Sequence, residues 1–219
     1  LENKDLTDEE ILNNYMALFI AGVDTTSHWI AHCMYAIDKN PICKKKVYEE
    51  VDQYFNSNDN YENFAFEKVS KNNPPYLMAV MKETMRFFTS SPDLFPRVAN
   101  KDHMLGDLKI KKGTILDVSF MLNMLSEENF PNPSEFRPER WLEDEKMESK
   151  LNPFAYIPFS AGLRNCLGQH MSKLEGKIIL AAFFKKYDFT VVDIDSITWS
   201  YTFGYQTTKP LILKIKERK

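Results

Sequence analysis

The sequence predicts a mainly α-helical protein with small β-sheets, an α+β fold. Three observations support this prediction. Helix start signals and apolar residues at helical spacing mark residues 8–38, 41–55 and 74–88. Short apolar stretches separated by glycine turns fill residues 94–119, which we expect to form the main sheet, and apolar and polar residues alternate within 187–219. At 219 residues and 43% hydrophobic content, the chain is large enough for a substantial core.

The composition excludes several classes of protein. A formal net charge of −3 gives no reason to expect a nucleic acid partner, which would require a basic stripe. The three cysteines, Cys33, Cys43 and Cys166, contain no Cys-x-x-Cys pair, so neither a disulfide framework nor a zinc knuckle is predicted, and a reducing compartment is expected. The longest nearly continuous apolar run, residues 15–23, is far shorter than the roughly 20 residues that cross a membrane.

The first predicted helix contains a segment that does not favour helix. Thr7 and Glu10 form a capping box, which starts the helix near residue 8. Residues 21–26, Ala-Gly-Val-Asp-Thr-Thr, then place poor helix formers inside it. Such a break indicates a functional site where a threonine hydroxyl competes for a backbone carbonyl and opens the helix. The alternative is a glycine at a close helix crossing and a threonine that bonds back to its own helix.

Two further groups on the predicted helices are interpreted as structural. His28 and His32 are spaced to chelate a metal, but a zinc-protease helix would need glutamate where Trp29 stands, so we expect core or surface histidines. Asn40 before Pro41 starts the second helix, and its three lysines at 44–46 are expected to face solvent.

The third predicted helix carries a possible ion pair. Its buried side is expected to consist of Leu77, Val80, Met81, Thr84 and Phe88. Glu83 and Arg86 are three residues apart, hence neighbours on one helical face. By itself such a pair is most often a surface ion pair worth 0 to about 1 kcal/mol. A second arginine, Arg140, follows within Pro-Glu-Arg-Trp in the proline-rich stretch 130–157.

Residues 159–168, Phe-Ser-Ala-Gly-Leu-Arg-Asn-Cys-Leu-Gly, form a loop that leads into a long helix. Cys166 is placed at a helix N-terminus, where a thiolate is stabilised. Gly162 and Gly168 permit positive φ or close approach of a ligand, and Arg164 can bind a carboxylate. These features describe a socket for haem, whose iron accepts a thiolate and whose edge carries propionates; a buried structural cysteine is the alternative. The expected buried face of the helix is Leu167, Met171, Leu174, Ile178 and Ala181 or Ala182.

This loop resembles the cysteine-loop signature of the cytochrome P450 haem-thiolate monooxygenases. Residues 21–26 are similar to the family's oxygen-binding groove, and Glu-x-x-Arg and Pro-Glu-Arg-Trp follow in the family's order. The resemblance covers the C-terminal half of a typical member. It implies that residues 1–219 are the C-terminal haem-binding part, with a groove helix at about 8–38, a meander at 130–157 and the cysteine loop and its helix at 158–186. The N-terminal half, which carries any membrane anchor, is expected to be absent, because the chain starts just before the groove helix without methionine.

The resemblance also implies roles for single residues. Cys166 would be the axial ligand of the iron of haem b, and Asp24 and Thr25 would bring protons and hold dioxygen. The other cofactor-binding residues would be Arg164, Arg97, Phe159, Gly162, Gly168, Ala21 and Gly22. Glu83, Arg86 and Arg140 would form a buried structural lock. Substrate contacts would come from Ser91, Asp93, Leu94 and Phe95. For Arg97 the alternative is a surface arginine on an edge strand.

The implied activity is insertion of one oxygen atom of O2 into a small apolar organic substrate. Electrons would come from a separate NADPH-dependent reductase, because no dinucleotide fingerprint follows any predicted strand. Lys173 and Lys177 could dock that reductase or simply face solvent. By resemblance the protein belongs at the cytoplasmic face of the endoplasmic reticulum membrane. The alternatives are a haem-thiolate isomerase or dehydratase, disfavoured by the Asp24–Thr25 pair, and a non-catalytic fragment that does not hold haem by itself.

Overall fold

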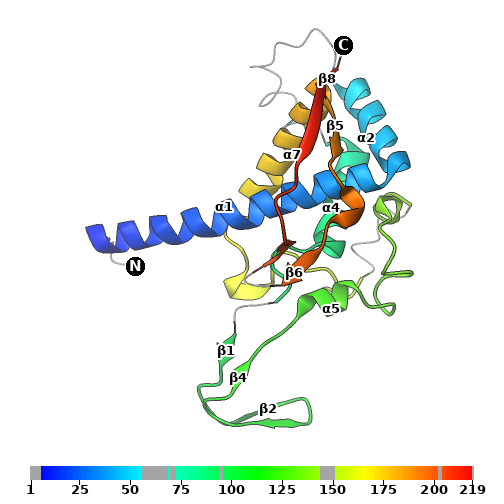
Figure 1. Ribbon diagram of the computed structural model, residues 1–219. Helices are drawn as coiled ribbons and strands as arrows, with labels where there is room; N and C mark the ends of the chain where they lie inside the picture. Colours follow the sequence, from blue (N-terminus) through cyan, green and yellow to red (C-terminus); the bar gives the residue numbers. More distant parts are fainter. Residues whose placement is uncertain are drawn as a thin grey trace.

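Four helices make up the centre of the computed structural model, which describes residues 6–55, 69, 73–93, 96–143, 151–201 and 204–218. They are α1 (Asp8–Lys39), α2 (Pro41–Tyr54), α4 (Pro75–Phe87) and α7 (Gln169–Lys186). Figure 1 shows α1 crossing the molecule as a long rod, with its N-terminal half projecting beyond the other elements. The predicted mainly helical fold with small sheets is confirmed.

The ends of α1 follow from local chemistry. The Glu10 backbone N–H donates to Thr7 Oγ1 at 3.3 Å, and the Thr7 N–H donates to Glu10 Oε2 at 2.9 Å, so the predicted capping box is present. At the other end Asn40 is both the C-cap of α1 and the N-cap of α2, and Pro41 occupies the first turn of α2. The two helices therefore follow one another with a single connecting residue.

The main core lies where the C-terminal half of α1 meets the other three helices. Its fully buried side chains include Ile37 of α1, Val47 of α2, Leu77 of α4 and Leu180 of α7. All five residues expected on the buried side of α4 are buried. Because each large apolar side chain contributes about 1.5–3 kcal/mol when removed from water, this contact holds the four helices together.

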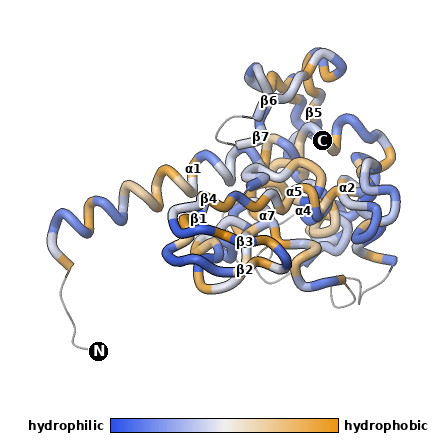
Figure 2. The backbone as a smooth tube through the Cα atoms, turned by 90° about the horizontal axis from the view of Figure 1, so that it is seen from below, coloured by the Kyte–Doolittle hydropathy of each residue, from blue (hydrophilic) through white to orange (hydrophobic). Residues whose placement is uncertain are grey.

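The N-terminal half of α1 has no such cover. Residues 6–24 are exposed, and large apolar side chains point outward around the helix, as with Tyr15, Phe19 and Ile20, each more than half exposed. Figure 2 shows this stretch, in which orange turns alternate with blue ones, extending away from the rest of the chain. An exposed apolar surface of this kind is normally covered by another part of a larger protein or by a partner.

The β structure consists of short ladders. The described residues form four two-stranded antiparallel sheets. They pair β1 (Arg97–Val98) with β4 (Ile115–Leu116), β2 (His103–Leu105) with β3 (Leu108–Ile110), β5 (Tyr187–Val191) with β8 (Leu213–Glu217), and β6 (Trp199–Tyr201) with β7 (Tyr205–Thr207). The expectation of a main sheet at 94–119 is wrong, because the described residues of that stretch form two separate, largely exposed ladders and the longest ladder in the described part of the chain is β5–β8.

Short elements connect these parts. They are α5 (Phe120–Met124) and the 3₁₀ turns η2 (Pro138–Trp141), η3 (Gly162–Arg164) and η4 (Ile194–Ser196). The described part of the proline-rich stretch 130–157 has no regular structure apart from η2, as expected where prolines remove backbone donors.

The helix after the cysteine loop buries only part of the expected face: Ala181 is fully buried and Ile178 packs against the core, but the positions nearest the loop are not covered. Leu167 and Met171 are 82% and 66% exposed. The buried positions of α7 are Gly176, Lys177, Leu180, Ala181 and Phe184. The difference arises because only the C-terminal part of α7 packs against the core, where Gly176 lies directly against the Trp29 ring.

The lysines of α2 differ from expectation in part, since all three form ion pairs and only Lys45, which pairs with Glu49 at 3.7 Å, is exposed. Lys44 Nζ pairs with Asp38 at 3.0 Å and with Asp188 at 3.1 Å, and Lys46 Nζ binds Glu139 at 2.7 Å. Neighbouring carboxylates on other elements decided this outcome, which helical spacing could not predict.

Candidate functional site

The carboxylate of Glu83 is the centre of a fully buried ion cluster. Arg86 donates from Nε and from one terminal nitrogen to the two carboxylate oxygens, both at 2.9 Å, and Arg140 Nε donates at 3.0 Å. Trp141 Nε1 and the Arg137 backbone N–H each donate at 2.9 Å. Five hydrogen bonds thus satisfy one carboxylate, which compensates for the cost of burying its charge.

The two guanidinium groups of this cluster hold the chain that follows α5. Arg86 donates to the carbonyls of Met124, Pro133 and Glu135. Arg140 donates to those of Pro131, Asn132 and Glu135. The cluster therefore anchors an irregular segment to α4, and the structure brings together all three residues that the sequence grouped. Trp141, which follows Arg140 directly, is a further member of the cluster that was not predicted.

The cysteine loop closes on itself before α7 begins. The Cys166 N–H donates to the Phe159 carbonyl at 2.9 Å, and Gly162 adopts φ +79°, a conformation that favours glycine. The N-cap of α7 is Gly168, so Cys166 lies two residues before the cap rather than in the first turn. A Cβ added to Gly168 would lie 4.0 Å from Cys166 Sγ.

Cys166 differs from the other two cysteines in its environment. It is exposed, whereas Cys33 and Cys43 are buried, and all three are free thiols. Burial raises the pKa of both Cys33 and Cys43 to about 12, so these two remain protonated. The alternative interpretation of Cys166 as a buried structural cysteine is wrong.

Two arginines that were predicted to bind the cofactor are exposed. Arg164 lies in η3 and Arg97 in β1, and neither guanidinium group makes a hydrogen bond or ion pair with any described residue. Their donors are thus available for an anionic group. By contrast, Lys177 is 5% exposed and donates to Asn73 Oδ1 at 3.0 Å, so it is excluded from a reductase-docking surface. Lys173 Nζ lies over the Phe159 ring, 4.9 Å from its centre.

The predicted groove segment lies within continuous α-helix. Thr25 Oγ1 donates to the Ala21 carbonyl at 2.8 Å, one turn earlier, and Thr25 is half-buried. Asp24, Ala21 and Gly22 are exposed, and a Cβ added to Gly22 would meet no atom within 4 Å. The threonine therefore bonds back to its own helix, as the alternative interpretation stated, and the predicted opening of the helix is not seen. The other part of that alternative, a glycine at a close helix crossing, does not hold for Gly22.

The helix of the predicted groove, α1, crosses α7, the helix that follows the cysteine loop. Thr26 Oγ1 donates to Ser172 Oγ at 3.0 Å, and a Cβ on Gly176 would lie 2.5 Å from the Trp29 ring. Trp29 Nε1 also donates to the Met81 carbonyl of α4 at 3.3 Å. One crossing therefore joins the helix of Asp24 and Thr25 to the helix that starts after Cys166.

Comparisons with known proteins match this arrangement. The family model described as Cytochrome P450 matches residues 1–215. The chain belongs to the cytochrome P450 family. Its relatives include the rat mitochondrial 1,25-dihydroxyvitamin D(3) 24-hydroxylase, 32% identical over 192 residues, and the probable cytochrome P450 4s3 of Drosophila melanogaster, 36% identical over 187 residues. These matches cover 88% and 84% of this chain but 36% and 34% of the relatives.

Solved structures show the same fold. The crystal structure of the cytochrome P450DA heme domain has a TM-score of 0.85 at 24% identity, and the match covers 100% of this chain and 47% of that one. This P450 chain thus spans about a third of the length of its curated relatives and about half of that solved domain. No helix in the described residues is long and apolar enough to cross a membrane.

One of the two helix histidines of this P450 chain, His32, lies in structural surroundings. His32 is 1% exposed, and its Nδ1 donates to the Phe88 carbonyl at 2.8 Å. Burial lowers the pKa of His32 to about 4, so the ring is neutral at pH 7. Among the described residues no group of three His, Cys, Asp or Glu side chains is placed to hold a metal ion. The expectation of a structural histidine is confirmed for His32.

Two cavities lie in different parts of the P450 chain. One of about 210 Å³ is lined by Asp24, Thr25, His28, Ser90, Ser91, Gly204 and Gln206. It includes Ser91 from the residues expected at the substrate. Asp93 does not line this cavity; its backbone forms an isolated β-bridge with Ser119. Leu94 and Phe95 lie outside the described residues.

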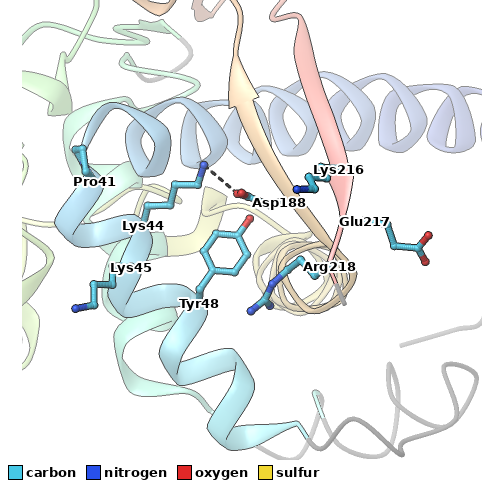
Figure 3. Close-up of a pocket in the computed structure, with 8 residues that line it drawn as sticks. All are labelled: Pro41, Lys44, Lys45, Tyr48, Asp188, Lys216, Glu217 and Arg218. Carbon is cyan, nitrogen blue, oxygen red and sulfur yellow. Dashed lines mark ion pairs between the residues drawn. The ribbon is translucent and has the colours of Figure 1, made fainter.

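The larger cavity, about 640 Å³, lies between α2 and the β5–β8 ladder (Figure 3). None of the predicted site residues lines it. Two of its cations are already bonded: Lys44 pairs with Asp188, drawn as the dashed line in Figure 3, and Arg218 pairs with Asp52 at 2.6 Å. These side chains are therefore already paired with carboxylates, and the larger cavity is a weaker candidate for a binding site than the smaller one.

Proposed function

We propose that this chain is the haem-binding C-terminal part of a cytochrome P450 monooxygenase, which inserts one atom of O2 into an apolar organic substrate. The proposal rests on one relationship: the exposed thiol of Cys166 precedes α7, and α7 contacts α1 directly beside Thr25 through the Thr26–Ser172 hydrogen bond. A ligand for iron and a polar pair on the facing helix are thereby held by one helix crossing.

The exposed groups suit a haem b. Cys166 would bind the iron, while Arg164 and Arg97 would bind the propionates with donors that no described residue uses. The remaining contacts would come from Phe159, Gly162, Gly168, Ala21 and Gly22. The open space around Gly162 and Gly22, where an added Cβ would meet nothing within 4 Å, supports close approach of a flat ligand.

When bound, a thiolate-ligated haem supplies dioxygen activation and favours cleavage of the O–O bond. The residues of this chain would then control protons and orientation. The Thr25 hydroxyl donates its one hydrogen bond to the Ala21 carbonyl. The two lone pairs of the hydroxyl oxygen are therefore left to accept a hydrogen bond from a water. Asp24, exposed and adjacent, would exchange protons with solvent and pass them toward that position.

The Glu83 cluster would act on structure, not on chemistry. Its two arginines hold six carbonyl contacts in the segment that leads toward the cysteine loop. We infer that losing Glu83 reduces haem incorporation before it affects any catalytic step.

The complete protein would need a further segment. The apolar side chains around residues 6–24 of α1 are the surface that we propose is covered by the N-terminal half of the full protein. That half would carry the membrane anchor and much of the substrate pocket. We place the full protein at the cytoplasmic face of the endoplasmic reticulum membrane, where a separate NADPH-dependent reductase would supply electrons. Membrane fractionation tests whether the full protein is found in the endoplasmic reticulum or in mitochondria. The name of the rat relative describes that protein as mitochondrial.

The proposed function is tested on the full-length protein that contains this chain. A carbon monoxide difference spectrum of the reduced protein is expected to place the Soret band at the thiolate position. Product formation should require both NADPH and a reductase. Turnover of a hydroperoxide without either would support the isomerase or dehydratase instead, and absence of bound haem would support a non-catalytic protein.

A further inference from the structure

We propose that the 210 Å³ cleft beside Asp24 and Thr25 binds a hydroxyl group on an otherwise apolar substrate, and that His28 determines this specificity. This inference rests on the proposed function and names a substrate class for it. A cleft of this size is smaller than the roughly 300–1,000 Å³ of pockets that enclose whole ligands. It therefore suits one polar group of a larger molecule.

Three elements build the cleft. Asp24, Thr25 and His28 come from one side of α1, because residues four apart lie above one another on a helix. The segment after α4 supplies Ser90 and Ser91, and the β6–β7 hairpin supplies Gly204 and Gln206. Every lining residue except the glycine has a side chain able to form hydrogen bonds.

The walls are held in place by contacts behind the cleft. The Tyr205 N–H donates to the Ser90 carbonyl at 3.1 Å, and a Cβ on Gly204 would lie 2.5 Å from that same oxygen. The Tyr205 ring stacks on Trp199 with centroids 5.2 Å apart, and Trp199 meets the buried His32 ring at 5.2 Å. A packed aromatic group thus fixes the hairpin against the serine segment, so the cleft is preformed.

One atom at the cleft lacks a partner. Ser90 Oγ is buried and makes no hydrogen bond with any described residue. Leaving a buried hydroxyl unpaired is unfavourable, so native proteins usually satisfy such groups with another polar group. Ser90 lines the cleft, and rotation about its χ1 would turn the hydroxyl toward a ligand, which then supplies the missing partner.

The charges of the lining select the type of ligand group. The carboxylate of Asp24 accepts hydrogen bonds and repels anions, whereas the His28 imidazole can donate. A neutral hydroxyl can donate to Asp24 and accept from His28 at once. A ketone can only accept, and a carboxylate would face Asp24 with like charge. A hydroxyl is therefore the ligand group whose hydrogen bonds match the lining of the cleft.

The test uses two rigid ligands that differ in one group, 1-adamantanol and adamantane, titrated into the full-length protein. Binding is followed by calorimetry and, where haem is present, by the Soret shift. We expect the alcohol to bind about tenfold more tightly than the hydrocarbon. His28→Phe should remove most of this preference, and Ser90→Ala should reduce it. The matched control is His103→Phe, which changes an exposed histidine of β2 outside the cleft and should keep the preference.

Several results would overturn the proposal. Equal affinity for the two ligands in the wild type would mean that the cleft holds only water. A preference that persists in both His28→Phe and Ser90→Ala would arise elsewhere, for example from direct ligation of iron. These outcomes leave a thiolate spectrum intact and so differ from failure of the proposed function. If that spectrum is absent, calorimetry still measures the preference.

Discussion

Thr26 on α1 and Ser172 on α7 share a hydrogen bond of 3.0 Å between their side-chain oxygens. Thr26 follows the proposed oxygen-side residue Thr25, and Ser172 lies about one helical turn beyond the end of the loop of Cys166. One turn further along α7, Gly176 lies against Trp29. The two proposed halves of the site are thus positioned by a helix crossing of small and aromatic residues.

Gly176→Ala is expected to destabilise the protein by about 1–3 kcal/mol, the usual cost of overpacking a core. The added Cβ would lie 2.5 Å from a Trp29 ring that is buried and bonded to the Met81 carbonyl, so the ring cannot move easily. The measurement is the free energy of unfolding in urea. Gly22→Ala is the control: it lies in exposed helix with open space and should stabilise by about 0.5–1 kcal/mol. Equal effects of the two substitutions would contradict the tight crossing.

Glu83→Gln is expected to cost about 3–5 kcal/mol, because Arg86 and Arg140 would remain buried without a counter-charge. Purified protein should also contain less haem per chain. Glu49→Gln is the matched control, since Glu49 pairs with Lys45 on the surface at 3.7 Å and its loss should cost under about 0.5 kcal/mol. Urea unfolding and the ratio of haem to protein are measured for both variants. Retention of full stability in Glu83→Gln would show that the cluster is not needed for the fold.

Cys166→Ser is expected to abolish the thiolate position of the Soret band in the reduced, carbon-monoxide-bound protein, because the soft sulfur ligand is lost. Since Cys166 is exposed, the unfolding free energy should change by less than about 0.5 kcal/mol. Cys43→Ala is the control for removing a thiol: it should keep the band and cost stability, because Cys43 is buried. A thiolate band that survives Cys166→Ser would assign the iron ligand to another residue.

Thr25→Ala is expected to keep the thiolate spectrum but to release peroxide in place of product, because a hydroxyl at the proposed proton path is removed. The measured quantity is peroxide formed per NADPH consumed, with substrate and reductase present. Ser27→Ala removes a neighbouring exposed hydroxyl that bonds to the Asp24 carbonyl at 3.1 Å and should leave the ratio unchanged. If product yield in Thr25→Ala equals that of the wild type, Thr25 has no part in proton delivery.

His32 is expected to make stability depend on pH. Burial disfavours the charged ring and lowers the pKa of His32 from its ordinary value of 6.5 to about 4 in the folded protein. The unfolded chain therefore binds a proton first, and stability is lost as the pH falls from about 6.5 to 4, by up to about 3 kcal/mol. Urea unfolding across this range should show a shallower slope in His32→Gln. His103→Gln, at an exposed position, should retain the wild-type slope. Parallel slopes for wild type and His32→Gln would contradict a neutral buried His32.

Several features of this P450 chain were accessible from sequence because they depend on neighbours a few residues apart. The capping box at Thr7 and the pairing of Glu83 with Arg86 are interactions over three residues, and both occur. Predictions that required knowledge of distant partners fared less well. A lysine is normally expected at the surface, but Lys177 is buried and donates a hydrogen bond to Asn73, which is far away in sequence.

Local chemistry encoded the helices, their caps, the order of the motifs and the family, since these depend on spacing along the chain. Packing between distant segments settled the remaining features: which face of α7 is buried, the division of residues 97–116 into separate ladders, and the addition of Trp141 to the Glu83 cluster. The same holds for the cleft of His28 and Ser90, which belong to different elements. Burial and hydrogen bonding between such segments depend on the three-dimensional arrangement of neighbours, which a one-dimensional pattern does not contain.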